Sequence, residues 1–326
     1  MQSRYEIYDY LISKIKNTNE NENEINCLDK STGNIFELFY YDSYKYRLKK
    51  LNIFLIKIIG EESEMGTVYL SKYKNYKFVS KIILLNNFSI IELEITQRLS
   101  DIAYKTNNIH LPLLYGHSLC NKINIELKLI NEEKYNPKNS YYCLFIELYE
   151  GSLYILLLKL LKLFDNNDIE LFKKIINNIF IQCLISILSC HINNIYHNDS
   201  HINNFLYCRS QLSSKTYKYL YKYNDLEFNL NSYPFTISIC DFGLSEFKND
   251  DNDDYDFKND YNILLDTINK YYIDKYKLNQ IIELSNIKNL LDISKNDYDF
   301  FKNLKENNFF NDDNDNKKSE IVINLT

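Results

Sequence analysis

The 326-residue sequence lacks tryptophan and contains a single alanine, Ala103, with only six glycines and three prolines. These low glycine and proline contents exclude collagen-like and proline-rich low-complexity chains. Asparagine, lysine, isoleucine and tyrosine are abundant instead, which we attribute to an AT-rich coding bias rather than to the fold. Because the strongest helix former and the usual turn formers are scarce, propensity is a weak guide, and single Asn or Asp matches in a motif are less specific than usual.

The charge balance also excludes some functions. The chain has 38 Lys and Arg against 44 Asp and Glu, a formal net charge of −6, so we expect no broad basic surface and no nucleic-acid partner. The seven cysteines include no CxxC pair, and no zinc site is expected. Residues 1–10 lack a secretory signal pattern, and polar residues interrupt the apolar stretch 175–192, which favours a core helix over a membrane span. We therefore expect a cytoplasmic protein without a membrane partner; no pattern indicates an oligomeric state.

Hydrophobic periodicity predicts an α+β chain with two lobes, since its length exceeds what one core usually supports. The expected elements are a helix at 4–17, strands at 68–70, 78–85, 111–120 and 141–150 around a helix at 87–102, and long helices at 152–164 and 170–194. The expected organisation is an N-terminal extension at 1–50, a strand-rich lobe at 51–149, a mainly helical lobe at 150–310 and a polar tail at 311–326.

Two segments in the first lobe suggest a phosphate-binding function. The run GEESEMGTV holds Gly60 and Gly66, and taken alone it is better explained as an ordinary hairpin turn. It gains weight because Lys81 lies on the next predicted strand and Glu92 on the helix that follows. A lysine that holds phosphates needs a carboxylate to orient it.

The more specific pattern lies in the second lobe. The segment HNDSHINN (197–204) places Asp199 and Asn204 five residues apart, and Cys-Asp-Phe-Gly (240–243) places Asp241 after a short β-like run. In this arrangement Asp199 can accept a proton from a hydroxyl, while Asn204 and Asp241 hold metal ions against a triphosphate. Any one of these residues is consistent with a polar loop, but the ordered set favours phosphoryl transfer.

Taken together, these motifs resemble those of eukaryotic-type protein kinases, over about residues 55–270. The matching segments are FVSK (78–81), ELEITQRL (92–99), LFIELYEGSL (144–153), HNDSHINNFL (197–206) and ICDFGLS (239–245). The resemblance implies a bilobal kinase-like fold, ATP and Mg²⁺ as cofactors, and a protein substrate phosphorylated on Ser or Thr.

The resemblance also assigns roles to individual residues. It implies that Lys81 pairs with Glu92, with Glu94 as the alternative, and that Asp260 is a structural residue on a buried helix. The residues implied at the nucleotide are Gly60, Gly66, Val68 and Lys81, with the backbone of Glu147 and Tyr149 at the adenine; those implied in catalysis are Lys81, Glu92, Asp199, His201, Asn204 and Asp241, of which Asn204 and Asp241 bind the metal.

Several positions depart from the family pattern. The glycine-rich loop lacks its middle glycine, which puts nucleotide affinity in question. Asn198 stands where the family has an Arg that pairs with a phosphorylated activation loop, so such phosphorylation is not the expected switch. His201 replaces a Lys, and an imidazole there could still contact the γ-phosphate. Asn204 and Asp241 lie 37 residues apart, and no Ala-Pro-Glu follows, so a reduced C-lobe is expected.

This combination is similar to kinases of giant and other large DNA viruses, and partly to haspin-type kinases. Two other functions stay open: a pseudokinase that acts as a scaffold, and a small-molecule kinase of the aminoglycoside or choline type. The acidic run 250–256 is either a solvated loop or a docking site for basic protein substrates.

Overall fold

The computed structural model describes residues 4–15, 28–30, 46–48, 52–59, 66–121, 140–164, 169–209, 217–231, 233–248, 256–278, 284–310 and 319–325. The chain divides into two compact units. The first comprises Met1–Gln97 and Leu113–Leu148, and the second comprises Arg98–Pro112 and Tyr149–Thr326. Each unit is described by itself.

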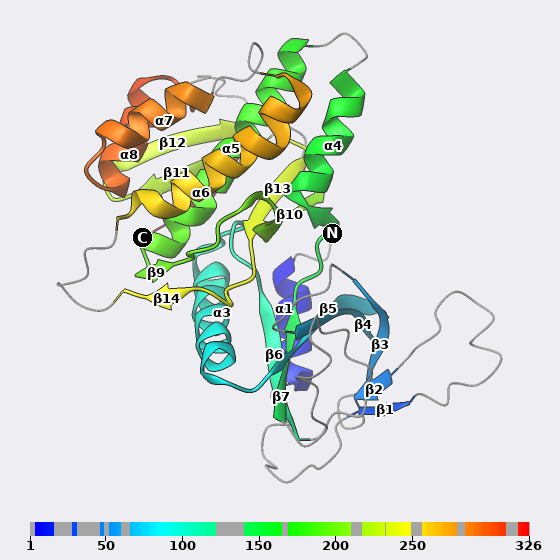
Figure 1. The fold of residues 1–326 in the computed structure, drawn as a ribbon. Coiled ribbons are helices and arrows are strands. Elements are labelled where there is room, and N and C mark those ends of the chain that lie inside the picture. The colour runs from blue at the N-terminus through cyan, green and yellow to red at the C-terminus, as the bar shows by residue number, and fades with distance from the viewer. Residues whose placement is uncertain are drawn as a thin grey trace. The chain divides into compact units, whose positions relative to one another are not determined.

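The first unit is built on a seven-stranded sheet in which every neighbouring pair is antiparallel (Figure 1). Its strands, in sheet order, are β1 (Leu28–Lys30), β2 (Tyr46–Leu48), β3 (Ile53–Ile58), β4 (Gly66–Tyr73), β5 (Tyr76–Leu84), β7 (Ser140–Ile146) and β6 (Leu114–Asn121). The predicted strands are confirmed. Strands β1 and β2 lie inside the segment that the sequence assigned to an N-terminal extension, so that segment continues the sheet.

Two helices contribute to this unit, the second of them only as far as Gln97. Helix α1 (Arg4–Ile15) buries Tyr8, Leu11 and Ile15, which share one face at helical spacing. Helix α3 (Asn87–Thr106) begins after a reciprocal cap: Asn86 Oδ1 accepts the N–H of Ser89, and Ser89 Oγ accepts the N–H of Asn86, both at 2.9 Å. This cap fixes the start of the helix that carries Glu92.

The second unit is centred on helix α5 (Ile169–His191), most of which is buried. The helix is long and apolar enough to cross a membrane by length and composition, but 72% of its most apolar window is buried inside the structure. This is the pattern of a core helix, as the sequence predicted. The other helices are α4 (Leu153–Phe164), α6 (Lys258–Ile268), which continues into a π-helical turn (Asn269–Asp274), α7 (Leu284–Ile293) and α8 (Asp297–Glu306).

Three small sheets accompany these helices. Strands β8 (Gly151–Ser152), β10 (Phe205–Arg209) and β13 (Phe235–Ile239) form one, β9 (Ile195–Tyr196) and β14 (Glu246–Phe247) form another, and β11 (Tyr217–Tyr223), β12 (Leu226–Asn231) and β15 (Ser319–Asn324) form the third. A 3₁₀ turn, η3 (Ile202–Asn204), precedes β10.

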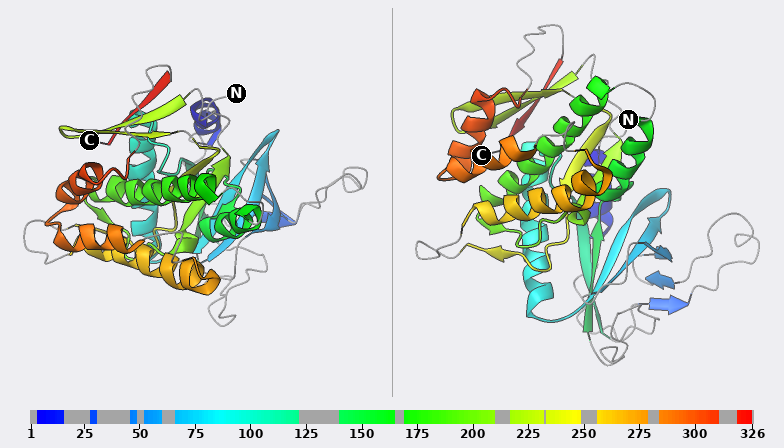
Figure 2. Two further views of the ribbon diagram at one scale, coloured as in Figure 1. Left: turned by 90° about the horizontal axis from the view of Figure 1, so that it is seen from above. Right: turned by 45° about the horizontal axis from the view of Figure 1, so that its top comes forward.

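The C-terminal strand differs from the expected polar tail. Strand β15 pairs in parallel with β11 of the Tyr-rich hairpin, and the right-hand view of Figure 2 shows it beside that hairpin. Ile323 is fully buried, and the Lys218 ammonium lies 2.9 Å from the Glu320 carboxylate. The sequence did not predict this strand, because its short alternating pattern follows a run of polar residues before Ser319. The α+β class is confirmed, with a β-rich first unit and a mainly helical second unit.

Candidate active site

Lys81 and Glu92 form a buried ion pair within the first unit. Lys81 lies on β5 and Glu92 on α3, and Lys81 Nζ is 2.5 Å from Glu92 Oε1. Their side chains are only 10% and 3% exposed. Two charges removed from water in this way are tolerable only when paired, because either one alone carries a large desolvation cost. The structure brings Glu92 to Lys81, whereas the alternative, Glu94, is exposed.

Gly66 is required by the packing of the sheet. It begins β4 opposite Ile83 of β5, and a Cβ at this position would overlap the carbonyl oxygen of Ile82 and lie 2.6 Å from Ile83 Cγ2. The backbone approach between β4 and β5 therefore explains this glycine without a phosphate. Val68 pairs with Lys81 across the same two strands. Gly60 lies outside the described residues.

The predicted adenine contacts follow β7. The N–H of Glu147 donates to the carbonyl of Leu113 at 2.9 Å, which continues the pairing of β6 with β7 by one residue. The Glu147 carboxylate contacts Arg4 Nη2 at 2.6 Å. Tyr149 is half-buried and begins the second stretch of the second unit.

The catalytic-loop candidates come together in the second unit. Asn204 Nδ2 donates to the backbone carbonyl of Asp199 at 2.8 Å and to its carboxylate oxygen Oδ2 at 2.9 Å. His201 Nε2 lies 3.5 Å from the same Oδ2. The other ring nitrogen, Nδ1, accepts the N–H of Asn203 at 3.1 Å, so Nε2 carries the proton that faces Asp199. The Asp199 side chain remains 35% exposed.

His197 connects this loop to the segment that carries Asp241. His197 Nδ1 accepts the N–H of Asp199 at 3.3 Å, and Nε2 donates to the carbonyl of Cys240 at 2.9 Å. Burial lowers the pKa of His197, which keeps the ring neutral in this bridging form. In addition, the N–H of Cys240 donates to the carbonyl of Asn204 at 2.8 Å. Asp241, next in the chain, is exposed and has a positive φ of 65°.

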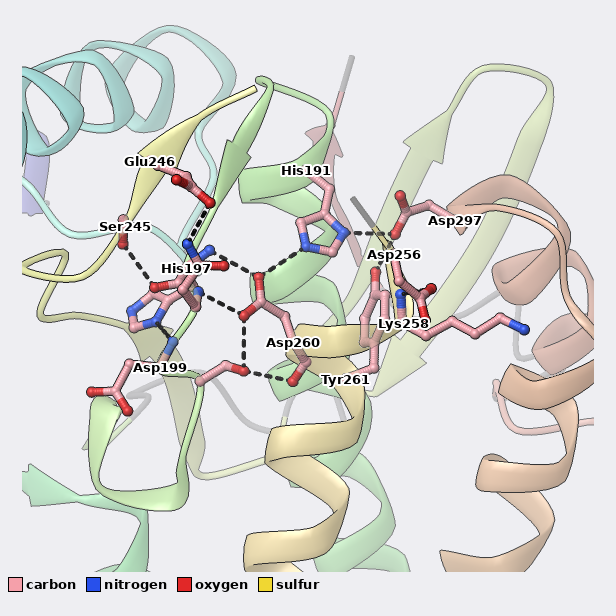
Figure 3. Close-up of polar contacts among 12 residues, drawn as sticks. His191, His197, Asp199, Ser245, Glu246, Asp256, Lys258, Asp260, Tyr261 and Asp297 are labelled. Atoms are coloured by element: carbon pink, nitrogen blue, oxygen red, sulfur yellow. Dashed lines mark hydrogen bonds and ion pairs between the residues drawn. The ribbon is translucent and has the colours of Figure 1, made fainter. Parts of the chain in front are cut away.

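Asp260 on α6 holds the loop through hydrogen bonds to its backbone (Figure 3). Its carboxylate accepts the N–H groups of His197 and Asn198, each at 2.8 Å, and its backbone carbonyl accepts the Ser200 hydroxyl at 2.5 Å. Asn198 has a positive φ of 61°, and these bonds hold that conformation. The structural position that the sequence resemblance implied for Asp260 is thus occupied by a fully buried carboxylate.

His191 connects Asp260 on α6 to Asp297 on α8. Its Nε2 lies 3.1 Å from Asp260 Oδ2, and its Nδ1 lies 3.0 Å from Asp297 Oδ1, at the start of α8. The Tyr261 hydroxyl donates to the same Asp297 oxygen at 2.6 Å. Burial lowers the pKa of His191, but the charge of Asp297 and the hydrogen bonds to both carboxylates outweigh it and raise the pKa to about 9. His191 is therefore an imidazolium at neutral pH.

Sequence reasoning did not identify His191, Asp297 or Tyr261. The three come from α5, α8 and α6, and no local motif joins positions so far apart in the chain. A histidine in the last turn of a long apolar helix was the one available signal, since such a residue needs a partner when buried.

Asn198 occupies the position at which the kinases resembled by these motifs have an arginine, and its side chain makes hydrogen bonds there. Its Nδ2 donates to the carbonyl of Leu244 at 3.3 Å and to Glu246 Oε1 at 2.9 Å. Glu246 begins β14, which pairs with β9, and Ser245 Oγ donates to the carbonyl of His197 at 3.2 Å. Hydrogen bonds from the neutral Asn198 amide and the Ser245 hydroxyl, together with a two-residue strand pair, therefore hold the start of the segment after Asp-Phe-Gly.

The donor set of this loop fits Mg²⁺. Asn204 Nδ2 donates hydrogen bonds to the backbone carbonyl and the carboxylate of Asp199, so the amide oxygen Oδ1 can serve as a ligand atom, and Asp241 is exposed. Oxygen ligands of this kind suit Mg²⁺, which is usually bound by one or two carboxylates together with substrate phosphates. In the described part of the chain no group of three His, Cys, Asp or Glu residues forms a metal cage by itself.

Comparison with known proteins gives weak similarities. No protein-family model matches the chain. A stretch of 115 residues is 29% identical to the bifunctional purine biosynthesis protein PurH of Wigglesworthia glossinidia brevipalpis, covering 34% of this chain and only 20% of that protein. Among solved structures, the chain is similar to a Plasmodium kinase domain, with a TM-score of 0.36 and 17% identity over 62% of this chain and 53% of that one.

Proposed function

We propose that this protein is an ATP-dependent phosphotransferase that phosphorylates Ser or Thr hydroxyls of proteins. The observation that carries the proposal is the connected loop in the second unit, where Asn204 holds the Asp199 carboxylate and Cys240, next to Asp241, is bonded to Asn204. A scaffold has no physical need for this arrangement together with a buried Lys81–Glu92 pair.

Each residue has a role in this proposal. Asp199 accepts the proton of the acceptor hydroxyl, and the bond from Asn204 Nδ2 keeps its Oδ2 oriented. Asn204 Oδ1 and the Asp241 carboxylate hold Mg²⁺, which neutralises charge on the phosphates when bound. Lys81, oriented by Glu92, binds the α- and β-phosphates, and the backbone at Glu147 and Tyr149 binds the adenine. His201 donates Nε2–H toward Asp199 and lies beside the acceptor.

The finer features of the proposal come from the sequence resemblance. Large-DNA-virus kinases are the sub-family that the motifs resemble. The intracellular location is a separate expectation, based on the cysteine pattern and on residues 1–10. Of the acidic run proposed to dock basic substrates, only Asp256 lies among the described residues, so this docking role stays a prediction.

The test is transfer of labelled γ-phosphate from Mg·ATP to a panel of basic proteins. We expect label on protein from the wild-type chain and none from Asp241→Ala. Asp292→Asn is the matched control, because Asp292 is an exposed carboxylate on α7 and its loss should leave transfer unchanged. Label on small alcohols but never on protein would contradict the proposed substrate class. No transfer at all, with ATP still bound, would favour the scaffold.

A further inference from the structure

An ion pair connects the N-terminal helix to the predicted adenine-binding segment. Arg4 Nη2 lies 2.6 Å from Glu147 Oε2, across 143 residues of sequence, and the two side chains are only 18% and 15% exposed. A charge-assisted hydrogen bond of this length in a partly shielded place is stronger than a surface ion pair. Arg4 is the first described residue of α1, so the start of the helix places the guanidinium next to Glu147, just after β7.

Strand β6 of the sheet packs closely against α1. Gly116 of β6 has a φ of +148°, and a Cβ at this position would overlap Ile15 Cγ2 at the C-terminal end of α1. The pairing of β6 with β7 shifts register between Leu114 and Gly116, next to this contact. Tyr8 of α1 also packs against Tyr115, with ring centroids 6.2 Å apart. Figure 1 shows α1 alongside β6, and the two elements are in contact.

Glu147 is consequently held from two directions. Its N–H donates to the carbonyl of Leu113, which lies just before β6, and its carboxylate is held by Arg4. We propose that α1 is a working part of the nucleotide site, with Arg4 as a positioning residue that fixes Glu147 and thereby sets the affinity for the adenine of ATP. This inference rests on the proposed function, because it assumes that the backbone at Glu147 contacts adenine.

The proposal predicts a change in nucleotide affinity with little change in the chemical step. Arg4→Ala should weaken ATP binding about five- to tenfold and raise the KM for ATP by a similar factor, while kcat at saturating ATP stays within about twofold. Arg4→Lys should recover part of the affinity, because it keeps the charge but loses the planar guanidinium geometry. Lys14→Ala is the matched control, since it removes one cation from an exposed position on the same helix.

A double-mutant cycle separates this role from general stabilisation. Glu147→Ala keeps the backbone that contacts adenine and removes only the carboxylate. If Arg4 acts through Glu147, the double variant Arg4→Ala, Glu147→Ala should bind ATP no more weakly than the weaker single variant. The dissociation constant of ATP and the Tm are measured for each variant.

The outcomes are distinct. A lower ATP affinity for both single variants without further loss in the double variant supports the proposal. Unchanged affinity in Arg4→Ala, whether or not its Tm falls, overturns it while leaving the proposed function intact. If the wild-type chain binds no ATP, the proposed function fails first and this inference fails with it.

Discussion

The two groups of proposed catalytic residues are held in different ways. Lys81 and Glu92 meet as one ion pair between a strand and a helix, in which each charged group neutralises the other. Asp199 instead lies on a loop whose backbone is fixed by the Asp260 carboxylate, and that carboxylate is paired in turn with His191. We therefore expect the Lys81–Glu92 pair to be sensitive to loss of one charge, and the loop to be sensitive to loss of the buried Asp260 carboxylate.

The largest effect is expected at the anchor. Asp260→Asn removes the carboxylate charge that faces the buried imidazolium of His191 and weakens the bonds to two backbone N–H groups. Breaking a buried pair in this way should lower the free energy of unfolding by about 3–5 kcal/mol. Urea denaturation measures the change, with the exposed Asp266→Asn on the same helix as control. A loss comparable to that of the control would show that the loop does not depend on Asp260.

The role of the Lys81–Glu92 ion pair in phosphate transfer is tested through activity. Lys81→Met removes the cation that we propose binds the phosphates, and phosphate transfer should fall by at least about a hundredfold. Lys77→Met, an exposed lysine on the same strand, should leave the rate unchanged. Initial rates of γ-phosphate transfer give the comparison. Equal rates for the two variants would remove Lys81 from the proposed site.

The pH dependence of stability provides a sharper test of the loop anchor. The pKa of His191 is raised from 6.5 to about 9, so the stability from its charged form is complete below about pH 6.5 and is lost as the pH rises through about 9. The groups that face it are Asp260 and Tyr261 on α6, Asp297 on α8 and Tyr196 on β9. Urea unfolding at pH 6 and pH 10 should show a larger alkaline loss for the wild type than for His191→Asn. Equal losses would contradict the charged state.

The smallest effect is expected at Glu246. Its contact with Asn198 Nδ2, at 2.9 Å, is exposed and joins a charged group to a neutral amide. Such contacts contribute little, so Glu246→Ala should change the transfer rate by less than about threefold. The same rate assay measures the effect of the substitution. Untreated and phosphatase-treated protein are compared in parallel, because phosphorylation of this segment is not the expected switch. A tenfold loss would contradict this expectation. It would mean that the Glu246–Asn198 contact orders this segment, as the pairing of an arginine with a phosphorylated activation loop does in the kinases that these motifs resemble.

The sequence predicted the elements with strong periodicity and the local motifs. The strands around Lys81, the helix with Glu92 and the buried character of α5 followed from apolar spacing, and Asp199 and Asn204 were near enough in sequence to be paired. Glu92 was preferred to Glu94 from the family spacing, and the structure places only Glu92 at Lys81 while Glu94 is exposed.

The long-range partners could not be predicted. Arg4 and Glu147 lie 143 residues apart, and His191 and Asp297 lie 106 apart, so only the folded chain brings them together. Strand β15 was missed because six residues of alternating pattern follow a polar run, and its partner β11 lies about a hundred residues earlier in the chain. Gly66 was interpreted through phosphate binding, whereas packing between β4 and β5 already requires a glycine there.

The central claim is that Asp199 acts on an acceptor hydroxyl at a site that binds Mg·ATP. The most direct measurement compares wild type and Asp199→Asn for two quantities, the rate of γ-phosphate transfer to protein and the dissociation constant of ATP. The account predicts that transfer is lost in the variant while ATP binds nearly as tightly as in the wild type. Transfer at the wild-type rate by Asp199→Asn would contradict it.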